Sequence, residues 1–177
     1  YNYKYNKKVN LIYNFIDTSL FYNFNETRNG KFLYIGRISH EKNIAGLIKL
    51  FQRNKNCQID LYGQRNIAVK KIIIENTKNI NFFDPVNNDQ LPKILNQYSY
   101  IILPSKFEGL SKVLLESMAC GIFCITSNLI ENKFLIKDKK SGLTFRDISK
   151  LDLNYIKGID SVKTKIFQDA NISLINK

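Results

Sequence analysis

Cysteine and histidine are scarce in this chain, which argues against a disulfide-stabilised domain and against a domain built around a metal site. The three cysteines, Cys57, Cys120 and Cys124, include no Cys-x-x-Cys pair, and an odd number does not suit a disulfide framework. The single histidine, His40, cannot provide a cluster of histidine metal ligands. We therefore expect no metal site, and free thiols that pack as small apolar groups in the reducing environment of the cytoplasm.

Long apolar runs are also absent, since none approaches the ~20 residues that a membrane-spanning helix needs. The chain starts at Tyr1 without a methionine and without the pattern of a signal peptide, which suggests a piece of a longer protein. Its 177 residues suit one domain that can bury a proper core.

Negative charge is in short supply, because 27 lysines and arginines stand against 15 aspartates and glutamates, a net charge of +12. No strip of basic and aromatic residues marks a nucleic-acid module, so we expect no nucleic-acid partner. Two interpretations of the charge stay open. It reflects a general abundance of lysine, or it draws the protein to phosphates and to peripheral contact with the inner face of a membrane.

Stretches typical of strands and helices alternate along residues 31–145, which predicts an α/β fold. Strands are expected at residues 32–36, 59–63, 80–83, 100–103, 122–126 and 142–145. Helices are expected at residues 43–53 and 70–76, and in stretches that begin at Asn88 and near Leu110, with Asn43 and Asn88 as N-caps. The fold class is therefore a Rossmann-like parallel sheet with helices on both faces.

The same pattern suggests three parts of the chain. Residues 1–13 are assigned to a linker and a first strand at Val9–Tyr13, and residues 14–150 to the Rossmann-like domain. Residues 151–177 are expected to form C-terminal helices.

Two carboxylates stand out in residues 104–126. Glu108 lies in a short loop after an apolar strand, and Glu116 lies within the helix that follows. They are eight residues apart, a little over two turns, so both can face the carboxyl edge of the sheet, where ligands bind in such folds. A second interpretation also fits: Ser105 and Glu108 could form a capping box, and Glu116 could be a solvated helix residue.

A second loop has the composition of a phosphate site. The strand at residues 32–36 ends in Gly36, and Arg37 and Lys42 follow before the next helix. Strand, glycine, short loop and helix form a layout that binds phosphates. Two cations at such a loop could clamp a diphosphate, or they could be ordinary surface charges.

Together these motifs resemble those of GT-B glycosyltransferases, in particular the C-terminal, donor-binding domain of the retaining glycosyltransferase family 4. Members carry Gly-Arg, four residues and Lys, followed downstream by Glu, seven residues and a second Glu, and both spacings are present here. The resemblance implies that Arg37 and Lys42 stabilise the diphosphate that leaves. It also implies that Glu108 holds the donor sugar and Glu116 the ribose hydroxyls.

Four further positions belong to the donor site by the same resemblance: Gly36, Gly109, Leu110 and Ser111. The Leu110-Ser111 pair departs from the family, because many members have Phe-Gly at this place. A glycine there would let backbone amides approach the donor, so the serine alters the expected sugar contacts.

The resemblance implies transfer of a sugar from a nucleotide diphosphate sugar to an acceptor hydroxyl, with retention of configuration. No Asp-x-Asp pair is present, so the metal-binding motif of the other large glycosyltransferase fold is missing and we expect no metal cofactor. The expected acceptor is a glycan or a lipid-linked sugar, as in the assembly of surface polysaccharide or glycolipid.

The N-terminal domain of the same protein is a further expected partner, on which residues 151–177 would pack. The chain alone is then expected to bind the donor without transferring sugar, because catalysis needs both halves of the cleft. Three alternatives remain: a sugar-nucleotide epimerase or phosphorylase, a non-catalytic nucleotide-binding domain of the same fold, and, ranked last, a basic nucleic-acid binder.

Overall fold

Six parallel strands form one sheet at the centre of the molecule. The computed structural model of the chain describes residues 14–64, 78–136 and 142–159. The strands are β1 (Phe32–Ile35), β2 (Ile59–Tyr62), β3 (Ile80–Phe83), β4 (Tyr100–Leu103), β5 (Phe123–Ser127) and β6 (Gly142–Phe145). Their order across the sheet is β3-β2-β1-β4-β5-β6, and all neighbours pair in parallel. The order therefore reverses between β1 and β4, which is the place where folds of this kind bind ligands.

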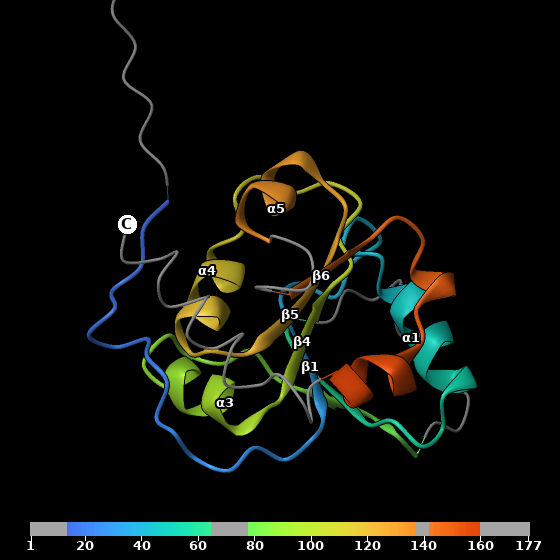
Figure 1. Cartoon of the computed structure of the whole chain (residues 1–177), viewed down its shortest axis with the longest axis horizontal. Helices are drawn as coiled ribbons and strands as arrows, with labels where there is room; N and C mark the ends of the chain where they lie inside the picture. Colours follow the sequence, from blue (N-terminus) through green and yellow to red (C-terminus); the bar gives the residue numbers. More distant parts are fainter. Residues whose placement is uncertain (1–13, 65–77, 137–141, 160–177) are drawn as a thin grey trace, which may run out of the picture.

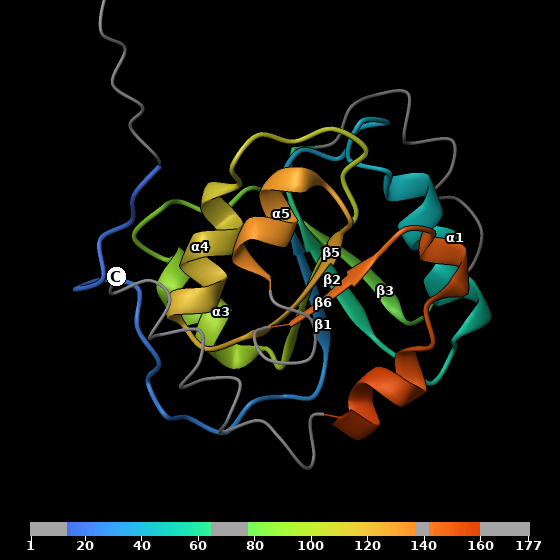
Figure 2. The ribbon, with the colours of Figure 1, turned by 45° about the horizontal axis from the view of Figure 1, so that its top comes forward.

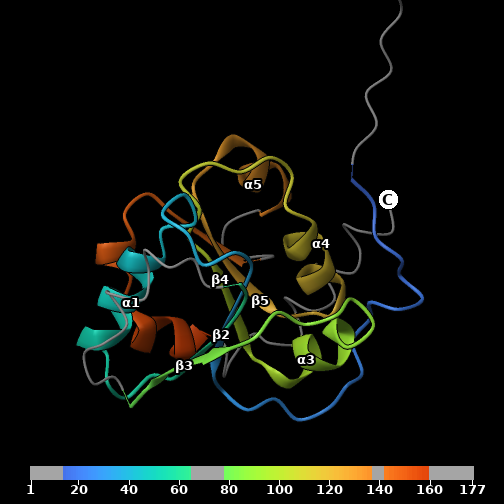
Figure 3. The same ribbon diagram turned by 180° about the vertical axis from the view of Figure 1, so that it is seen from behind.

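Helices cover both faces of this sheet (Figure 1). They are α1 (Ile44–Arg53), α3 (Leu91–Gln97), α4 (Lys112–Ala119), α5 (Ile130–Leu135) and the short 3-10 helix η1 (Ile148–Lys150). Helices α3 and α4 lie on one face, and α1 lies on the other, where η1 and the helical residues 153–159 pack beside it (Figure 3). Helix α5 lies beside α4 above the ends of the central strands (Figure 2).

The core is made by apolar side chains from both faces of the sheet. Phe32 on β1 illustrates its packing, because its ring stacks on Tyr100 at a centroid distance of 4.6 Å and meets Phe51 of α1 edge-on at 5.3 Å. Helix α1 contributes buried residues at helical spacing, Ile44, Leu47, Ile48 and Phe51 among them. The three cysteines are free and buried, as expected of small apolar side chains.

The fold class and the six strands expected from the sequence are confirmed, with β5 shifted by one residue. The helix expected at residues 70–76 and the strand expected at 9–13 lie outside the described residues. Within residues 14–64, 78–136 and 142–159, no helix has both the length and the apolar character that crossing a membrane requires.

Of the two predicted helix caps, Asn43 does occupy the N-cap position of α1, and Asn88 is wrong because the N-cap of α3 is Gln90. Asn43 adopts the left-handed conformation (φ 52°), however, and its side chain makes no capping hydrogen bond. An N-cap side chain reaches the helix from an extended backbone, so the left-handed conformation removes that bond. Helix α3 begins at Leu91 rather than after Asn88, since a start at Asn88 would place Pro92 where its missing N–H breaks the first helical hydrogen bond.

Candidate functional site

Two loops meet at the carboxyl edge of the sheet, where the strand order reverses. The first joins β1 to α1, and the second joins β4 to α4. Two contacts of Lys106 join them: its backbone N–H donates to the Glu41 carbonyl at 2.8 Å, and its Nζ lies 3.0 Å from His40 Nε2. The sheet thus brings together residues that are more than sixty positions apart in the sequence.

A cavity of about 240 Å³ lies between these loops. Five of the residues predicted for the site line it: Gly36, Arg37, Lys42, Glu108 and Ser111. The structure therefore joins the two motifs that the sequence suggested separately. The sequence analysis placed none of the other lining residues in the site, among them Tyr34, Lys112 and Val113, and it considered Ser105 only as a helix cap. Lys112 could have been found from its spacing of four residues to Glu116 on one helix.

Glu108 is held by a cation and a hydroxyl group. Lys42 Nζ forms an ion pair with Glu108 Oε2, and Ser105 Oγ donates to the same oxygen at 3.0 Å. The capping-box interpretation is wrong, because α4 begins at Lys112 and its N-cap is Ser111, whose Oγ accepts from the Leu114 N–H at 3.4 Å. The bonds of Glu108 therefore serve the cavity and not the start of the helix.

Arg37 is the second cation of the cavity. Its side chain is exposed and makes no hydrogen bond or salt bridge with the residues that the structure describes. The backbone beneath it is fixed, since Tyr34 Oη donates to the Arg37 carbonyl at 2.8 Å. Burial, and then the charge of Glu108, raise the pKa of this tyrosine, so it stays a neutral donor.

The position of Gly36 requires a residue without a side chain. Its φ of +146° is rarely adopted by other residues, and a Cβ would lie 2.9 Å from Tyr34 Oη. Gly63, at the end of β2, also packs against the Gly36 carbonyl so closely that a Cβ could not fit. The sequence named Gly36 as a loop glycine, and the structure gives the steric reason.

Gly109 and Leu110 lie beside the cavity without lining it. A Cβ at Gly109 would meet no atom within 4 Å, so the described structure does not require a glycine there. The Leu110 carbonyl accepts a hydrogen bond of 2.7 Å from Asn14 Nδ2. Asn14 belongs to the irregular segment that precedes β1 in the chain, and this bond ties that segment to the loop that leads into α4.

Glu116 lies one turn beyond Lys112 on α4 and does not line the cavity. Only 2% of it is exposed, so it is not the solvated helix residue of the second interpretation. Its Oε1 has no hydrogen-bond partner among the described residues, and Lys112 Nζ lies 3.6 Å from it. Burial raises the pKa of Glu116, and the charge of Lys112 opposes this only in part.

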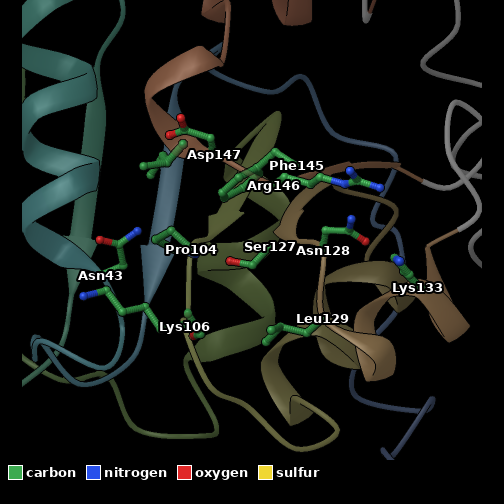
Figure 4. A pocket seen from close by; sticks show the side chains of 12 residues that line it. Asn43, Pro104, Lys106, Ser127, Asn128, Leu129, Lys133, Phe145, Arg146 and Asp147 are labelled. Atoms are coloured by element: carbon green, nitrogen blue, oxygen red, sulfur yellow. The ribbon is translucent and has the colours of Figure 1, made fainter.

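A second and larger cavity, of about 660 Å³, opens at the ends of β4, β5 and β6 (Figure 4). Its polar lining residues include Asn43, Lys106, Asn128, Lys133, Arg146 and Asp147. The sequence analysis assigned no function to these residues, because they come from four separate segments. In the described parts of the chain, no three His, Cys, Asp or Glu side chains are grouped closely enough to hold a metal ion.

The sequence matches one protein-family model and resembles known glycosyltransferases. The family model of glycosyl transferases group 1 matches residues 17–156. A capsular polysaccharide biosynthesis glycosyltransferase, CapH of Staphylococcus aureus, is 32% identical over 184 residues, which cover 96% of this chain and 51% of that protein. The UDP-Gal:alpha-D-GlcNAc-diphosphoundecaprenol alpha-1,3-galactosyltransferase of Escherichia coli is 27% identical over 89 residues, 50% of this chain and 21% of that protein. The chain thus spans about half of the first relative and less of the second.

Solved structures with a similar fold include the C-terminal domain of a glycosyl transferase group 1 family protein, LpcC of Francisella tularensis. Its TM-score is 0.72 at 17% identity, with coverage of 91% of this chain and 96% of that one. Anabaena HepE in complex with UDP and glucose has a TM-score of 0.72 at 16% identity, with coverage of 93% and 50%. At this level of identity, the likeness shows the fold alone, which is that of Rossmann-like GT-B domains.

Proposed function

The chain belongs to the glycosyl transferases group 1 family, and we propose that it binds the nucleotide diphosphate sugar of a retaining glycosyltransferase. One observation carries the proposal: Arg37, Lys42 and Glu108 surround one cavity where the strand order reverses. The whole protein would transfer the sugar to an acceptor hydroxyl, with the acceptor held in part by an N-terminal domain.

Arg37 and Lys42 would compensate the charge of the leaving diphosphate. When the bond between the sugar and the diphosphate breaks, negative charge grows on the phosphate oxygens, and fixed cations stabilise it. Arg37 offers a planar guanidinium that can bind two oxygens at once. Lys42 has three N–H donors. One can maintain the ion pair with Glu108 while the other two donate to phosphate oxygens. In this role the two cations take the place of a metal ion.

Glu108 would contact the sugar and Glu116 the ribose. The two bonds to Glu108 both reach Oε2, and Oε1 makes no hydrogen bond to a described residue, so it can accept from sugar hydroxyls. Oε1 of Glu116 has no hydrogen-bond partner among the described residues, and a carboxylate can accept bonds from two neighbouring hydroxyls. Ligand hydroxyls would thus supply hydrogen bonds that the described residues leave unmade.

The named relatives support a role in surface polysaccharide or glycolipid assembly. CapH is named for capsular polysaccharide, and the E. coli enzyme is named for a lipid-linked acceptor. We extend this class of acceptor to the present protein, together with cytoplasmic action at the inner face of the membrane. The strong positive charge suits contact with an anionic lipid surface.

Isothermal titration calorimetry of the chain with UDP and GDP tests the donor site. Arg37→Ala should weaken the nucleotide that the parent chain binds by about 1.5–3 kcal/mol, roughly 10- to 150-fold, the range for hydrogen bonds to charged groups. Lys93→Ala is the matched control, because Lys93 is exposed on α3 and lines neither cavity. Equal affinity of Arg37→Ala and the parent chain would refute the assignment.

Experiments on the whole protein separate the alternatives. A transferase consumes the nucleotide sugar only when an acceptor is present, apart from slow hydrolysis, whereas an epimerase converts it without one. A binding domain without catalysis would bind the donor and leave it unchanged. The anomeric configuration of the product, read by NMR, tests retention directly.

A further inference from the structure

The larger cavity is polar and carries an excess of positive charge. Three cationic side chains line it, Lys106, Lys133 and Arg146, against one carboxylate, Asp147. They come from the loop before α4, from α5 and from the end of β6. At neutral pH the lining residues therefore carry two more positive charges than negative ones, which favours an anionic ligand.

These cations are not neutralised by the one carboxylate. The side chains of Lys133 and Arg146 make no hydrogen bond or salt bridge with another described residue. Asp147 Oδ1 instead accepts from the Ser149 N–H at 2.9 Å, and bonds from Ser149 hold the pKa of Asp147 below its usual range. The positive charge is thus available to a ligand.

Asn128 adds a requirement of a different kind. Its backbone N–H donates to the Phe145 carbonyl at 2.7 Å, which fixes the residue at the wall of the cavity. Its Oδ1 is buried and has no hydrogen-bond partner among the described residues. Figure 4 shows the Asn128 amide between the ends of Arg146 and Lys133. An anionic oxygen without a hydrogen cannot satisfy Oδ1, which needs an O–H or N–H donor.

The remaining wall is apolar, with Pro104, Leu129 and Phe145 among the lining residues. A ligand that suits all three features has a negative group for the cations, a hydroxyl or amide donor for Asn128, and C–H surface for the apolar wall. A sugar that carries a phosphate or a carboxylate has this combination, and neither inorganic phosphate nor a neutral sugar does.

We propose that this cavity binds the anionic part of the acceptor, a sugar that bears a phosphate or a carboxylate. The proposal rests on the function proposed above, because it places the acceptor beside the donor. Ser105 lines both cavities, and its Oγ donates to Glu108, so the two ligands would lie on either side of one residue. The acceptor class of the E. coli relative, a GlcNAc diphospholipid by its name, contains such a sugar phosphate.

The test is an NMR titration of the ¹⁵N-labelled chain with UDP present at saturation. The probes are N-acetylglucosamine 1-phosphate, glucuronic acid, neutral N-acetylglucosamine and inorganic phosphate. We expect one or both anionic sugars to shift the signals of Asn128, Lys133 and Arg146. Comparison of N-acetylglucosamine 1-phosphate with glucuronic acid shows whether the cavity accepts a phosphate or a carboxylate.

Variants then locate the binding. Replacing Lys133 and Arg146 together by alanine should weaken the anionic sugar about tenfold or more, since hydrogen bonds to charged groups are lost. Asn128→Asp keeps the shape but adds a repelling charge, so it should weaken binding by a similar factor. Lys93→Ala should change nothing. All of these variants should keep the UDP affinity of the parent chain.

Several outcomes would overturn the inference. If UDP binds and neither anionic sugar shifts these signals, the second site is wrong and the proposed donor site stands. If UDP itself fails to bind, it is the proposed function that fails. Shifts that disappear when UDP is added would place the sugar phosphate in the donor cavity. Equal affinity for neutral sugar or for inorganic phosphate would contradict the predicted dual recognition.

Discussion

Glu116→Gln is the sharpest single test of the donor site, because the substitution keeps the shape of the side chain and removes its charge. If Glu116 accepts hydrogen bonds from two ribose hydroxyls, the amide can accept them only with its one oxygen and without charge. The lost bonds to a charged group correspond to about 1.5–3 kcal/mol, or roughly 10- to 150-fold in ribonucleotide affinity. The 2′-deoxy nucleotide, which lacks one of the two hydroxyls, should lose less.

The same substitution should make the protein more stable at neutral pH. Burial raises the pKa of Glu116 above its ordinary value of 4.5, so the folded state binds the proton more tightly than the unfolded state does. The cost of the charged form is therefore complete above the raised pKa and absent below the ordinary value. Glutamine does not ionise, so the variant should gain about 1 kcal/mol at pH 7, within the range for an unsatisfied buried group. This gain should shrink as the pH falls toward 4.5.

The assay combines calorimetric titration of ribo- and deoxynucleotide with urea unfolding between pH 7 and pH 4. Glu131→Gln is the matched control, because Glu131 is an exposed carboxylate on α5 that lines neither cavity. Loss of stability at pH 7 would show that the charge of Glu116 supports the fold. Equal weakening of both nucleotides, or no weakening, would remove the ribose assignment.

Substitutions at three further residues test single contacts. Ser111→Ala should cost about 1 kcal/mol of unfolding free energy through the lost N-cap, and Ser111→Gly only a few tenths; equal costs in urea unfolding would contradict the capping role. Asn14→Ala should weaken nucleotide binding by about 0.5–1.5 kcal/mol through its bond to Leu110, with stability nearly unchanged; calorimetry that finds parental affinity would exclude the link. Tyr98→Phe removes a buried 2.7 Å bond to Asp60 and should lower the unfolding free energy by about 1–3 kcal/mol, and an unchanged midpoint would count against the role of this bond.

The architecture could be predicted because local patterns determine most of it. Apolar runs of four or five residues between helical stretches mark parallel strands that are buried on both faces, and the six strands predicted within residues 31–145 are all present. The alternation does not determine the order β3-β2-β1-β4-β5-β6, which depends on how the helices pack. The order matters for function, because it makes β1 and β4 neighbours and so brings Arg37 and Glu108 to one cavity.

The contacts within the site could not be predicted, since they join distant segments. The ion pair between Lys42 and Glu108 spans 66 residues, and each residue fits its own motif without the other. The larger cavity is harder still to foresee, because Lys106, Lys133 and Arg146 belong to no common sequence pattern. They meet only because β4, β5 and β6 end side by side.

The two carboxylates of the central motif show how the environment separates residues that the sequence treats alike. Glu108 is half-buried, and an ammonium group and a hydroxyl group offset the cost of removing its charge from water. Glu116 is almost fully buried, yet one of its oxygens has no hydrogen bond to a described residue and its one cation lies 3.6 Å away on an exposed side chain. A folded chain selected only for stability would replace such a group, because glutamine or an apolar residue costs less there. We propose that the charge serves a ligand that supplies the missing hydrogen bonds, as a ribose with two adjacent hydroxyls would from one ring.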